Sequence, residues 1–342
     1  MIKFRFKILT VPLSNNYYQK IENLIKWLYN RIRHNDKYIT ERYRPFTIDQ
    51  VDKNLLDNTL DVAILMRGQV INNDDFTKNT LKMYRMNYPK SPIYLSTWDY
   101  CINNDLVSFL DNHNIKLVVS KFKKPKVGFK NNNLQITSNV KGLEMIMKDN
   151  IKFSLSIRTD QRFYSNNILL YLKNILSMYP YKKSSDRDHQ ISRLVAMSFD
   201  TFMFRIYALG DMFLFGLTKD VFNYWNNDKD TRIFKKDYHS KPMSIRSISK
   251  FREAEVYWMT EFLKRNGHDI DWSLKDYIEV LKKRFVIIDS YALDFFWPKY
   301  SSFEERFKDF EDIRFKDISH FDWLLMQKDK LKLDDKILDL EY

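Results

Sequence analysis

Residues 61–70 read DVAILMRGQV, an apolar segment that ends in Arg67 and Gly68. A short, nearly continuous apolar run followed by a glycine is typical of a strand that is buried on both faces and leads into a loop. Three more segments have this character, at residues 92–98 (PIYLSTW), 116–122 (KLVVSKF) and 152–160 (KFSLSIRTD). Together the four segments predict the strands of a parallel sheet.

Segments with helical patterns separate these strands. They run from about residue 76 to 88, where Pro89 follows, from about 105 to 112, and through Gly142 to Lys148. Strands that alternate with helices predict an α/β fold, Rossmann-like, with a mostly parallel sheet flanked by helices. In such sheets ligands bind beyond the carboxyl ends of the strands. The polar residues at the strand ends are therefore the first candidates for a binding site.

The rest of the chain predicts one elaborated domain. A helix, the strand-like RLVAMSFDTF (193–202), the segment LGDMFLFG (209–216), a helix beginning near Glu253 and the strand FVIIDSY (285–291) follow in order. No linker is long enough to separate a second domain. We interpret the chain as an N-terminal extension (1–58), a main α/β domain (59–300) and a charged C-terminal tail (301–342).

The N-terminal extension predicts an amphipathic helix. Its apolar residues at the spacing of one helical face are Ile21, Leu24, Ile25, Leu28 and Ile32, and basic residues lie mostly on the other side. Such a helix could lie on a membrane surface. The favoured interpretation is a helix that packs its apolar stripe on the core and exposes its basic face to solvent.

The formal net charge of +13 favours anionic partners: nucleic acid, an anionic membrane surface or phosphorylated substrates. The basic residues are spread along the chain rather than interleaved with aromatic residues on one strand, so no nucleic-acid platform is expected. Cys101 is the single cysteine, which excludes an internal disulfide and fits a reducing compartment. No apolar run approaches the ~18 residues of a membrane span, and the first residues carry charges where a signal peptide would be apolar. The sequence therefore predicts a cytoplasmic protein, soluble or peripheral on the membrane.

The segment IRTDQR at residues 157–162 concentrates polar groups at a strand end. Asp160 could bind a divalent cation through oxygen or accept a hydrogen bond from a sugar hydroxyl. Arg158 and Arg162 could hold a diphosphate, because guanidinium groups meet phosphate oxygens in a bidentate way. An ion pair of aspartate and arginine that only caps the strand is an equally open interpretation.

Two more acids are candidates. Asp211 stands between Gly210 and an aromatic run and could reach a binding cleft, or it could cap a short helix. Glu255 stands in the first turn of a predicted helix, where the helix dipole alone favours a carboxylate. A general base for sugar transfer also needs a positioned carboxylate, so Glu255 remains a candidate.

Several other site types find no support. The histidines show no paired ligand spacing, so a zinc site is not expected. The chain has only 6 glycines, and no glycine-rich phosphate loop, Walker motif or nucleophile elbow is present.

Six segments, in this order, resemble the WavE lipopolysaccharide synthesis family. They are DVAILMRGQV (61–70), FTKNTLKMYRMNYPKSPIYLSTW (76–98), NNNLQITSNVKGLE (131–144), IRTDQR (157–162), LGDMFLFG (209–216) and FVIIDSYALDFFWPKY (285–300). The combination of STW, RTDQR and the later Gly-Asp-aromatic segment carries the resemblance, which runs from about Asp61 to Tyr300.

The resemblance implies a glycosyltransferase of lipopolysaccharide core, O-antigen or capsule assembly, with a nucleotide-sugar donor and a glycan or lipid-linked glycan acceptor. The layout also resembles the GT-A type of glycosyltransferase, in which an Asp-x-Asp motif usually holds a metal ion and the donor diphosphate. This chain offers Asp160 with arginines around it instead. The arginines are expected to neutralise part of the leaving group's charge, and a Mn²⁺ or Mg²⁺ ion at Asp160 stays open.

The hypothesis assigns a role to each candidate residue. The nucleotide is expected at the Ala63–Gly68 strand end, including Arg67, and at Thr97, Trp98 and Asp99; Trp98 could equally be a core residue. Asn133 and Gln135, which open a helix, are expected to bind the donor sugar or phosphate. Arg158 and Arg162 would stabilise the departing diphosphate, and Asp211 or Glu255 would orient the acceptor hydroxyl, one of them as base if the reaction inverts the anomeric centre.

Rival functions of other classes are a non-catalytic protein that binds nucleic acid or another polyanion, suggested by the charge alone, and a scaffold of envelope assembly without turnover. A glycoside hydrolase would need two paired carboxylates, and no such pair stands out in the sequence.

Overall fold

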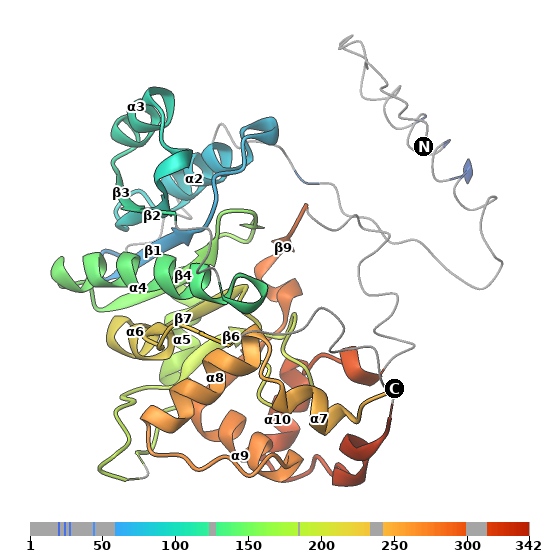
Figure 1. Cartoon of the computed structure of the whole chain (residues 1–342). Helices are drawn as coiled ribbons and strands as arrows, with labels where there is room; N and C mark the ends of the chain where they lie inside the picture. The colour runs from blue at the N-terminus through green and yellow to red at the C-terminus, as the bar shows by residue number, and fades with distance from the viewer. Residues whose placement is uncertain are drawn as a thin grey trace. The chain divides into compact units, whose positions relative to one another are not determined.

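The computed structural model describes residues 59–122, 128–183, 185–232, 242–298 and 313–341, together with Lys20, Leu24, Trp27, Leu28 and Arg44. The chain divides into two units, residues 1–44 and 45–342. Figure 1 colours the described residues by their place in the chain. Most of the predicted N-terminal helix lies outside the described residues. No helix in the described part of the chain is long and apolar enough to cross a membrane.

A seven-stranded sheet forms the centre of the second unit, with the strand order β3-β2-β1-β4-β7-β6-β8. Its strands are β1 (Val62–Arg67), β2 (Ile93–Trp98), β3 (Ile115–Ser120), β4 (Phe153–Arg158), β6 (Leu194–Met197), β7 (Phe213–Leu217) and β8 (Phe285–Ile288). β1, β2, β3 and β4 pair in parallel, and so do β6 and β8. The predicted α/β fold with a mostly parallel sheet is confirmed.

β7 is the exception, because it pairs antiparallel with both β4 and β6. This strand (FLFGL) begins within the segment LGDMFLFG and ends one residue beyond it. Its direction was not predicted, because a buried apolar run reads the same in either direction. The reversal places the start of β7, and with it Asp211, at the edge of the sheet where β1 and β4 end.

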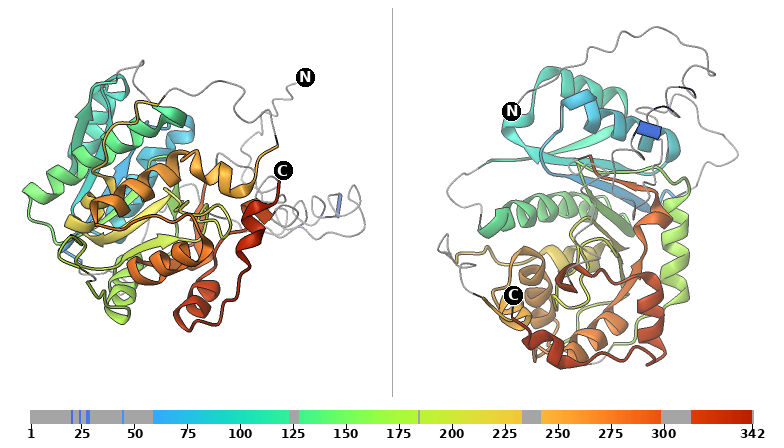
Figure 2. Two further views of the ribbon diagram at one scale, coloured as in Figure 1. Left: turned by 60° about the horizontal axis from the view of Figure 1, so that its bottom comes forward. Right: turned by 90° about the vertical axis from the view of Figure 1, so that its right-hand side faces the viewer.

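Helices cover both faces of the sheet (Figure 2). Their bounds are α2 (Phe76–Asn87), α3 (Asn104–Asn112), α4 (Asn132–Lys148), α5 (Ile168–Met178), α6 (Thr218–Trp225), α7 (Ile245–Lys250), α8 (Ala254–Arg265), α9 (Leu274–Arg284) and α10 (His320–Gln327). α4 packs on β1, β2, β3 and β4, and continues into a layer with α6 and α8. α2 and α5 lie on the opposite face, where Ile64 and Leu155 meet Tyr84 and Ile168.

The predicted C-terminal tail includes folded structure. Over residues 313–341, α10 packs on α9 and β8. Trp323 of α10 is fully buried and donates its indole N–H to the Leu281 carbonyl oxygen at 3.3 Å. A second, two-stranded sheet of β5 (Arg162–Phe163) and β9 (Phe295–Phe296) joins the end of the β4 segment to the region before this tail.

Close packing of α4 on β1 depends on Gly142. A Cβ atom at this position would lie 2.4 Å from a methyl carbon of Leu65, which is itself fully buried. Glycine in a helix interior is unfavourable by itself. Its presence here is explained by the close approach of the helix to the strand.

We expect Gly142→Val to lower the free energy of unfolding by about 3 kcal/mol, because the added methyl groups overpack a filled core. Urea denaturation monitored by circular dichroism measures this change. Lys141→Val, at the exposed neighbouring position in the same helix, is the matched control and should cost at most about 0.7 kcal/mol, the loss of helix propensity alone. Equal losses in the two variants would contradict the packing explanation.

Candidate functional site

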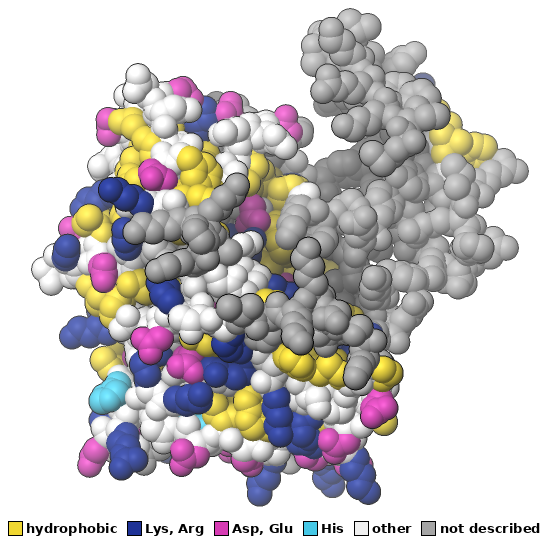
Figure 3. Space-filling view, in the orientation of Figure 1, with side chains coloured by type: hydrophobic (Ala, Val, Ile, Leu, Met, Phe, Trp, Pro, Cys, Tyr) yellow, Lys and Arg dark blue, Asp and Glu magenta, His cyan; other side chains and the backbone are white. Residues whose placement is uncertain are grey.

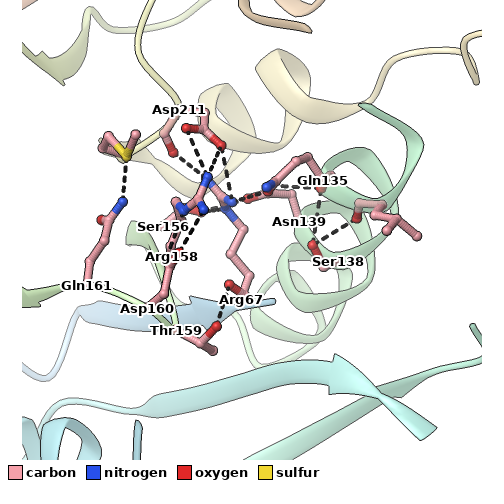
Figure 4. Close-up of polar contacts among 12 residues, drawn as sticks. Arg67, Gln135, Ser138, Asn139, Ser156, Arg158, Thr159, Asp160, Gln161 and Asp211 are labelled. Atoms are coloured by element: carbon pink, nitrogen blue, oxygen red, sulfur yellow. Dashed lines mark hydrogen bonds and ion pairs between the residues drawn. The ribbon is translucent and has the colours of Figure 1, made fainter. Parts of the chain in front are cut away.

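Three adjacent strands bring charged residues together at the carboxyl edge of the sheet. Arg67 ends β1 and Arg158 ends β4, and the two residues stand opposite each other in the parallel register. Asp211 precedes β7, which lies on the other side of β4. The sheet topology therefore places two guanidinium groups and a carboxylate side by side, as Figure 4 shows.

The Arg67 guanidinium is buried and held on all three of its nitrogens. Its side chain is 1% exposed. Nε donates to the Ser156 hydroxyl at 3.2 Å, Nη1 donates to the Gln135 amide oxygen, and Nη2 donates to the Asp211 backbone carbonyl. The guanidinium also lies over the Trp225 ring, 4.8 Å from its centroid. Arg67 therefore joins β1, β4, α4 and the start of β7.

The partners of Arg67 are themselves fixed by hydrogen bonds. Ser156 donates to the Asn139 side-chain oxygen at 2.6 Å, and the Asn139 amide donates to the Gln135 backbone carbonyl at 2.9 Å. With Arg67 these residues form a closed ring. Such a ring defines one position for the guanidinium.

Arg158 connects two acids. Its Nε and Nη2 donate to the two carboxylate oxygens of Asp160 at 2.9 and 2.8 Å, and its Nη1 lies 3.1 Å from Asp211 Oδ2. Trp297 donates its indole N–H to Asp160 at 3.1 Å, and the Arg158 guanidinium lies 5.2 Å from the Trp297 ring centroid. The side chains of Arg158 and Asp160 are 19% and 21% exposed. This part of the cluster reaches solvent, whereas Arg67 does not.

The four charges of the cluster balance one another. Burial alone would raise the pKa of Asp160, but the hydrogen bonds and positive charge of Arg158 and the bond from Trp297 hold it below its ordinary value. Burial lowers the pKa of Arg67 to about 10, against the opposing charge of Asp211. Both groups are therefore charged at neutral pH.

Glu255 lies in the first turn of α8 and is half-buried. Burial raises its pKa; the charge of Arg205 opposes this shift, and the negative charge of Asp211 adds to it. No hydrogen bond or ion pair joins the Glu255 side chain to another described residue. The neighbouring Glu253, by contrast, is bound by Arg205 and by Lys130, whose Nζ lies 2.7 Å from its carboxylate.

Two predicted donor-binding residues point elsewhere. Arg162 is 2% exposed; its Nε donates to the Thr80 hydroxyl at 2.9 Å and it lies over the Phe76 ring, so it faces α2 rather than the cluster. Asn133 is bound to Asp230 through two hydrogen bonds, of 2.9 Å to its carbonyl and 2.6 Å from its backbone N–H. Both side chains fix the positions of neighbouring segments.

The end of β2 contributes a separate group. Thr97 is fully buried, Trp98 is 4% exposed with its ring edge-on to Phe122, and Asp99 is exposed and accepts backbone N–H bonds from Tyr100 and Phe122. Trp98 is thus mostly a core residue, which was one of its two predicted interpretations.

Gly68 is required by the turn after β1. Its φ angle is +124°, and a Cβ there would lie 2.9 Å from the Thr159 hydroxyl oxygen. Thr159 in turn donates to the Gln69 carbonyl at 2.6 Å. Gly68 therefore allows the chain after β1 to pass close to the segment that carries Asp160.

The sequence analysis missed Ser156, Asn139, Trp225 and Trp297. One signal was present, since a serine within the buried strand FSLSIR is unusual and needs a polar partner. Trp297 carried no local signal. It comes from a segment 137 residues beyond Asp160.

Among the described residues no group of three or more His, Cys, Asp or Glu side chains could hold a metal ion. The Asp160 oxygens are occupied by Arg158 and Trp297. These residues by themselves do not fit a cation held by the protein alone.

Comparisons with known proteins leave the family open. No protein-family model matches the chain, and no curated protein matches it. A solved cytidylyltransferase from Leptospira borgpetersenii serovar Hardjo-bovis is similar, with 10% identity and a TM-score of 0.29 over 48% of this chain and 63% of that one. The match thus spans less than two thirds of that protein. A likeness at this level does not identify an activity, and the family resemblance stays a prediction.

We expect Arg67→Lys to lower the free energy of unfolding by about 3 kcal/mol. A lysine keeps the charge but cannot reach the Ser156, Gln135 and Asp211 oxygens together, and buried acceptors left unpaired are costly. Guanidinium chloride denaturation measures the change. Arg187→Lys at an exposed position is the control and should stay within about 0.5 kcal/mol of the wild type. If Arg67→Lys left the free energy of unfolding unchanged, the ring would not be what holds the sheet edge together.

Proposed function

We propose that this chain is a glycosyltransferase that moves a sugar from a nucleotide-sugar donor to a growing bacterial surface glycan. One observation carries the proposal: Asp160 and Asp211 are held by a single partly exposed guanidinium, that of Arg158, at the carboxyl edge of a parallel sheet. Ligands of such sheets bind at this edge. The family resemblance supplies the reaction class.

The contacts divide the two arginines by role. Both guanidinium groups bind protein through all three of their nitrogens, so their exposure separates them. The Arg158 side chain is 19% exposed, and its four contacts with Asp160 and Asp211 leave at least one of the five N–H groups of a guanidinium for a phosphate oxygen. The Arg67 side chain is 1% exposed and is out of reach of a ligand. We therefore assign contact with the departing diphosphate to Arg158 and the positioning of Asp211 to Arg67.

Two acids, Asp160 and Glu255, are assigned to contacts with the sugars. Asp160 is ionised and partly exposed, and its three hydrogen bonds with Arg158 and Trp297 leave about one of the four acceptor positions of a carboxylate for a hydroxyl group of the donor sugar. Glu255 has no bonded partner among the described residues and a raised pKa, which suits a general base. The acceptor is a glycan or lipid-linked glycan, and an anionic membrane surface is a further proposed partner.

The proposed reaction is a direct displacement at the anomeric carbon, with Glu255 as the base. As the acceptor oxygen forms its bond to the anomeric carbon, its proton passes to Glu255. The bond from that carbon to the diphosphate oxygen breaks, and its electron pair stays on the diphosphate beside Arg158. This sequence inverts the anomeric centre. No step requires a metal ion held by the protein.

Donor binding is the direct test. We expect one or more nucleotide sugars to raise the melting temperature, because a ligand at 100 times its Kd stabilises the folded state by about 2.7 kcal/mol. A panel of uridine, guanosine, cytidine and thymidine diphospho-sugars, with and without Mn²⁺, identifies the donor. A protein that no donor stabilises, and that hydrolyses none, would contradict the proposal.

A non-catalytic polyanion binder predicts a different outcome. Such a protein would bind heparin and any DNA with a steep dependence on salt. On the face shown in Figure 3, Lys and Arg side chains are interspersed with Asp and Glu side chains rather than gathered into one stripe. This face therefore offers no continuous basic stripe to a polyanion.

We expect Asp160→Asn to reduce transfer by about 100-fold or more, while the protein remains folded. The substitution removes the charge that meets the donor sugar and orients Arg158. Product formation from the identified donor measures the loss, and circular dichroism checks the fold. Asp105→Asn is the control, because Asp105 is 75% exposed on α3 and pairs only with Lys78; its transfer rate should equal that of the wild type.

The dependence of kcat/KM on pH should identify the base. Glu255 must be deprotonated to accept a proton, and its pKa is raised. We therefore expect kcat/KM to increase with pH through a midpoint above about 4.3, the ordinary pKa of a glutamate, and then to level off. Initial rates across the acid range measure the midpoint. In Glu255→Gln this rising limb should be absent, and a limb that persists unchanged would assign the base to another residue.

A further inference from the structure

The Tyr224 hydroxyl has no hydrogen-bond partner among the described residues, although aromatic rings surround it. Tyr224 lies near the end of α6 and is 2% exposed. Its ring packs against Trp225, Phe262 and Phe285 at centroid distances of 5.3, 5.3 and 6.3 Å. No hydrogen bond joins its hydroxyl to any described residue.

Glu255 is a second polar group of this region, and it is half-buried. It stands at the start of α8, which packs on α6, and its carboxylate has no bonded partner among the described residues. The indole N–H groups of Trp225 and Trp258 are also buried without a hydrogen bond in the described structure. Several polar groups on α6 and α8 thus have no hydrogen-bond partner among the described residues.

Ring contacts bring these groups together beside the cluster. The Trp225 and Trp258 rings are 4.9 Å apart, and Trp258 follows Glu255 by three residues, on the same face of α8. Trp225, next to Tyr224, lies under the Arg67 guanidinium. The electrostatics agree, because after burial the charges of Asp211 and Glu255 are the main groups that raise the pKa of Tyr224.

We propose that Tyr224 and Glu255 form the acceptor subsite and bind a neutral sugar through its hydroxyl groups. This inference rests on the proposed function and names the class of acceptor. The phenol O–H donates to one sugar oxygen, and Glu255 accepts from the hydroxyl that reacts. The negative charge of Glu255 disfavours an acceptor with a phosphate or carboxylate next to that hydroxyl.

Stability provides a first test that needs no ligand. Removing a hydroxyl that has no partner should not destabilise the fold, so Tyr224→Phe should melt within about 1 °C of the wild type. Tyr277→Phe is the matched control, because its buried hydroxyl donates to the Phe202 carbonyl at 2.9 Å. This variant should melt lower by about 2 °C or more. An equal loss in Tyr224→Phe would give its hydroxyl a structural role and overturn the proposal.

Binding of simple sugars is the second test. Saturation-transfer difference NMR with glucose, galactose and N-acetylglucosamine, and with glucose 6-phosphate as the anionic comparison, probes the subsite. We expect at least one neutral sugar to give a signal that falls at least fivefold in Tyr224→Phe, and glucose 6-phosphate to give none. No signal from any neutral sugar, equal signals in both proteins, or a signal from the phosphate that matches the neutral sugars would each overturn the proposal.

The two hypotheses fail separately. If nucleotide sugars stabilise the wild type but neutral sugars do not bind as expected, only the acceptor subsite is wrong. If no nucleotide sugar binds, the proposed function is wrong, whatever the NMR experiment finds. Tyr224→Phe should keep the donor-induced rise in melting temperature, because the donor contacts are assigned to Arg158 and Asp160.

Discussion

The hydrogen bonds that pair one buried guanidinium, that of Arg67, fix the arrangement of the carboxyl edge of the sheet. Arg67 is almost completely excluded from water, and a buried charge is tolerated only when its donors are all paired. Its partners come from β4, from α4 and from the chain that enters β7. Each of these segments must therefore end or begin at a defined place. The position of Asp211 follows from that constraint.

Arg158 extends this organisation to the surface. It pairs with Asp160 on one side and Asp211 on the other, so the positive charges at the sheet edge are balanced inside the protein. The sequence analysis assigned the diphosphate to Arg158 and Arg162 and the nucleotide to the strand end with Arg67. The contacts instead direct Arg162 to α2, make Arg67 a support and leave Arg158 with few free donors. Glu255 on α8 and Tyr224 on α6 have no hydrogen-bond partner among the described residues.

Much of the fold could be predicted because its signals are local. The apolar runs of β1, β2, β3, β4 and β8 and the helical pattern from residue 76 are close to the observed elements. The site was predicted only in part. Asp160, Arg158 and Asp211 were chosen one by one and do meet, but the sequence assigned Arg162 and Asn133 to a ligand, and their side chains bind other segments instead. A side chain's direction depends on distant neighbours.

The sequence by itself determined the fold class, the strand ends and the residue types that gather there, because strand and helix periodicity and strand ends are properties of neighbouring residues. Only the tertiary structure decided which charged groups pair. The direction of β7 and the return of the chain at Trp297 bring together side chains that are 53 and 137 residues apart. Electrostatic and hydrogen-bond energies depend on distance in space, which no local pattern records.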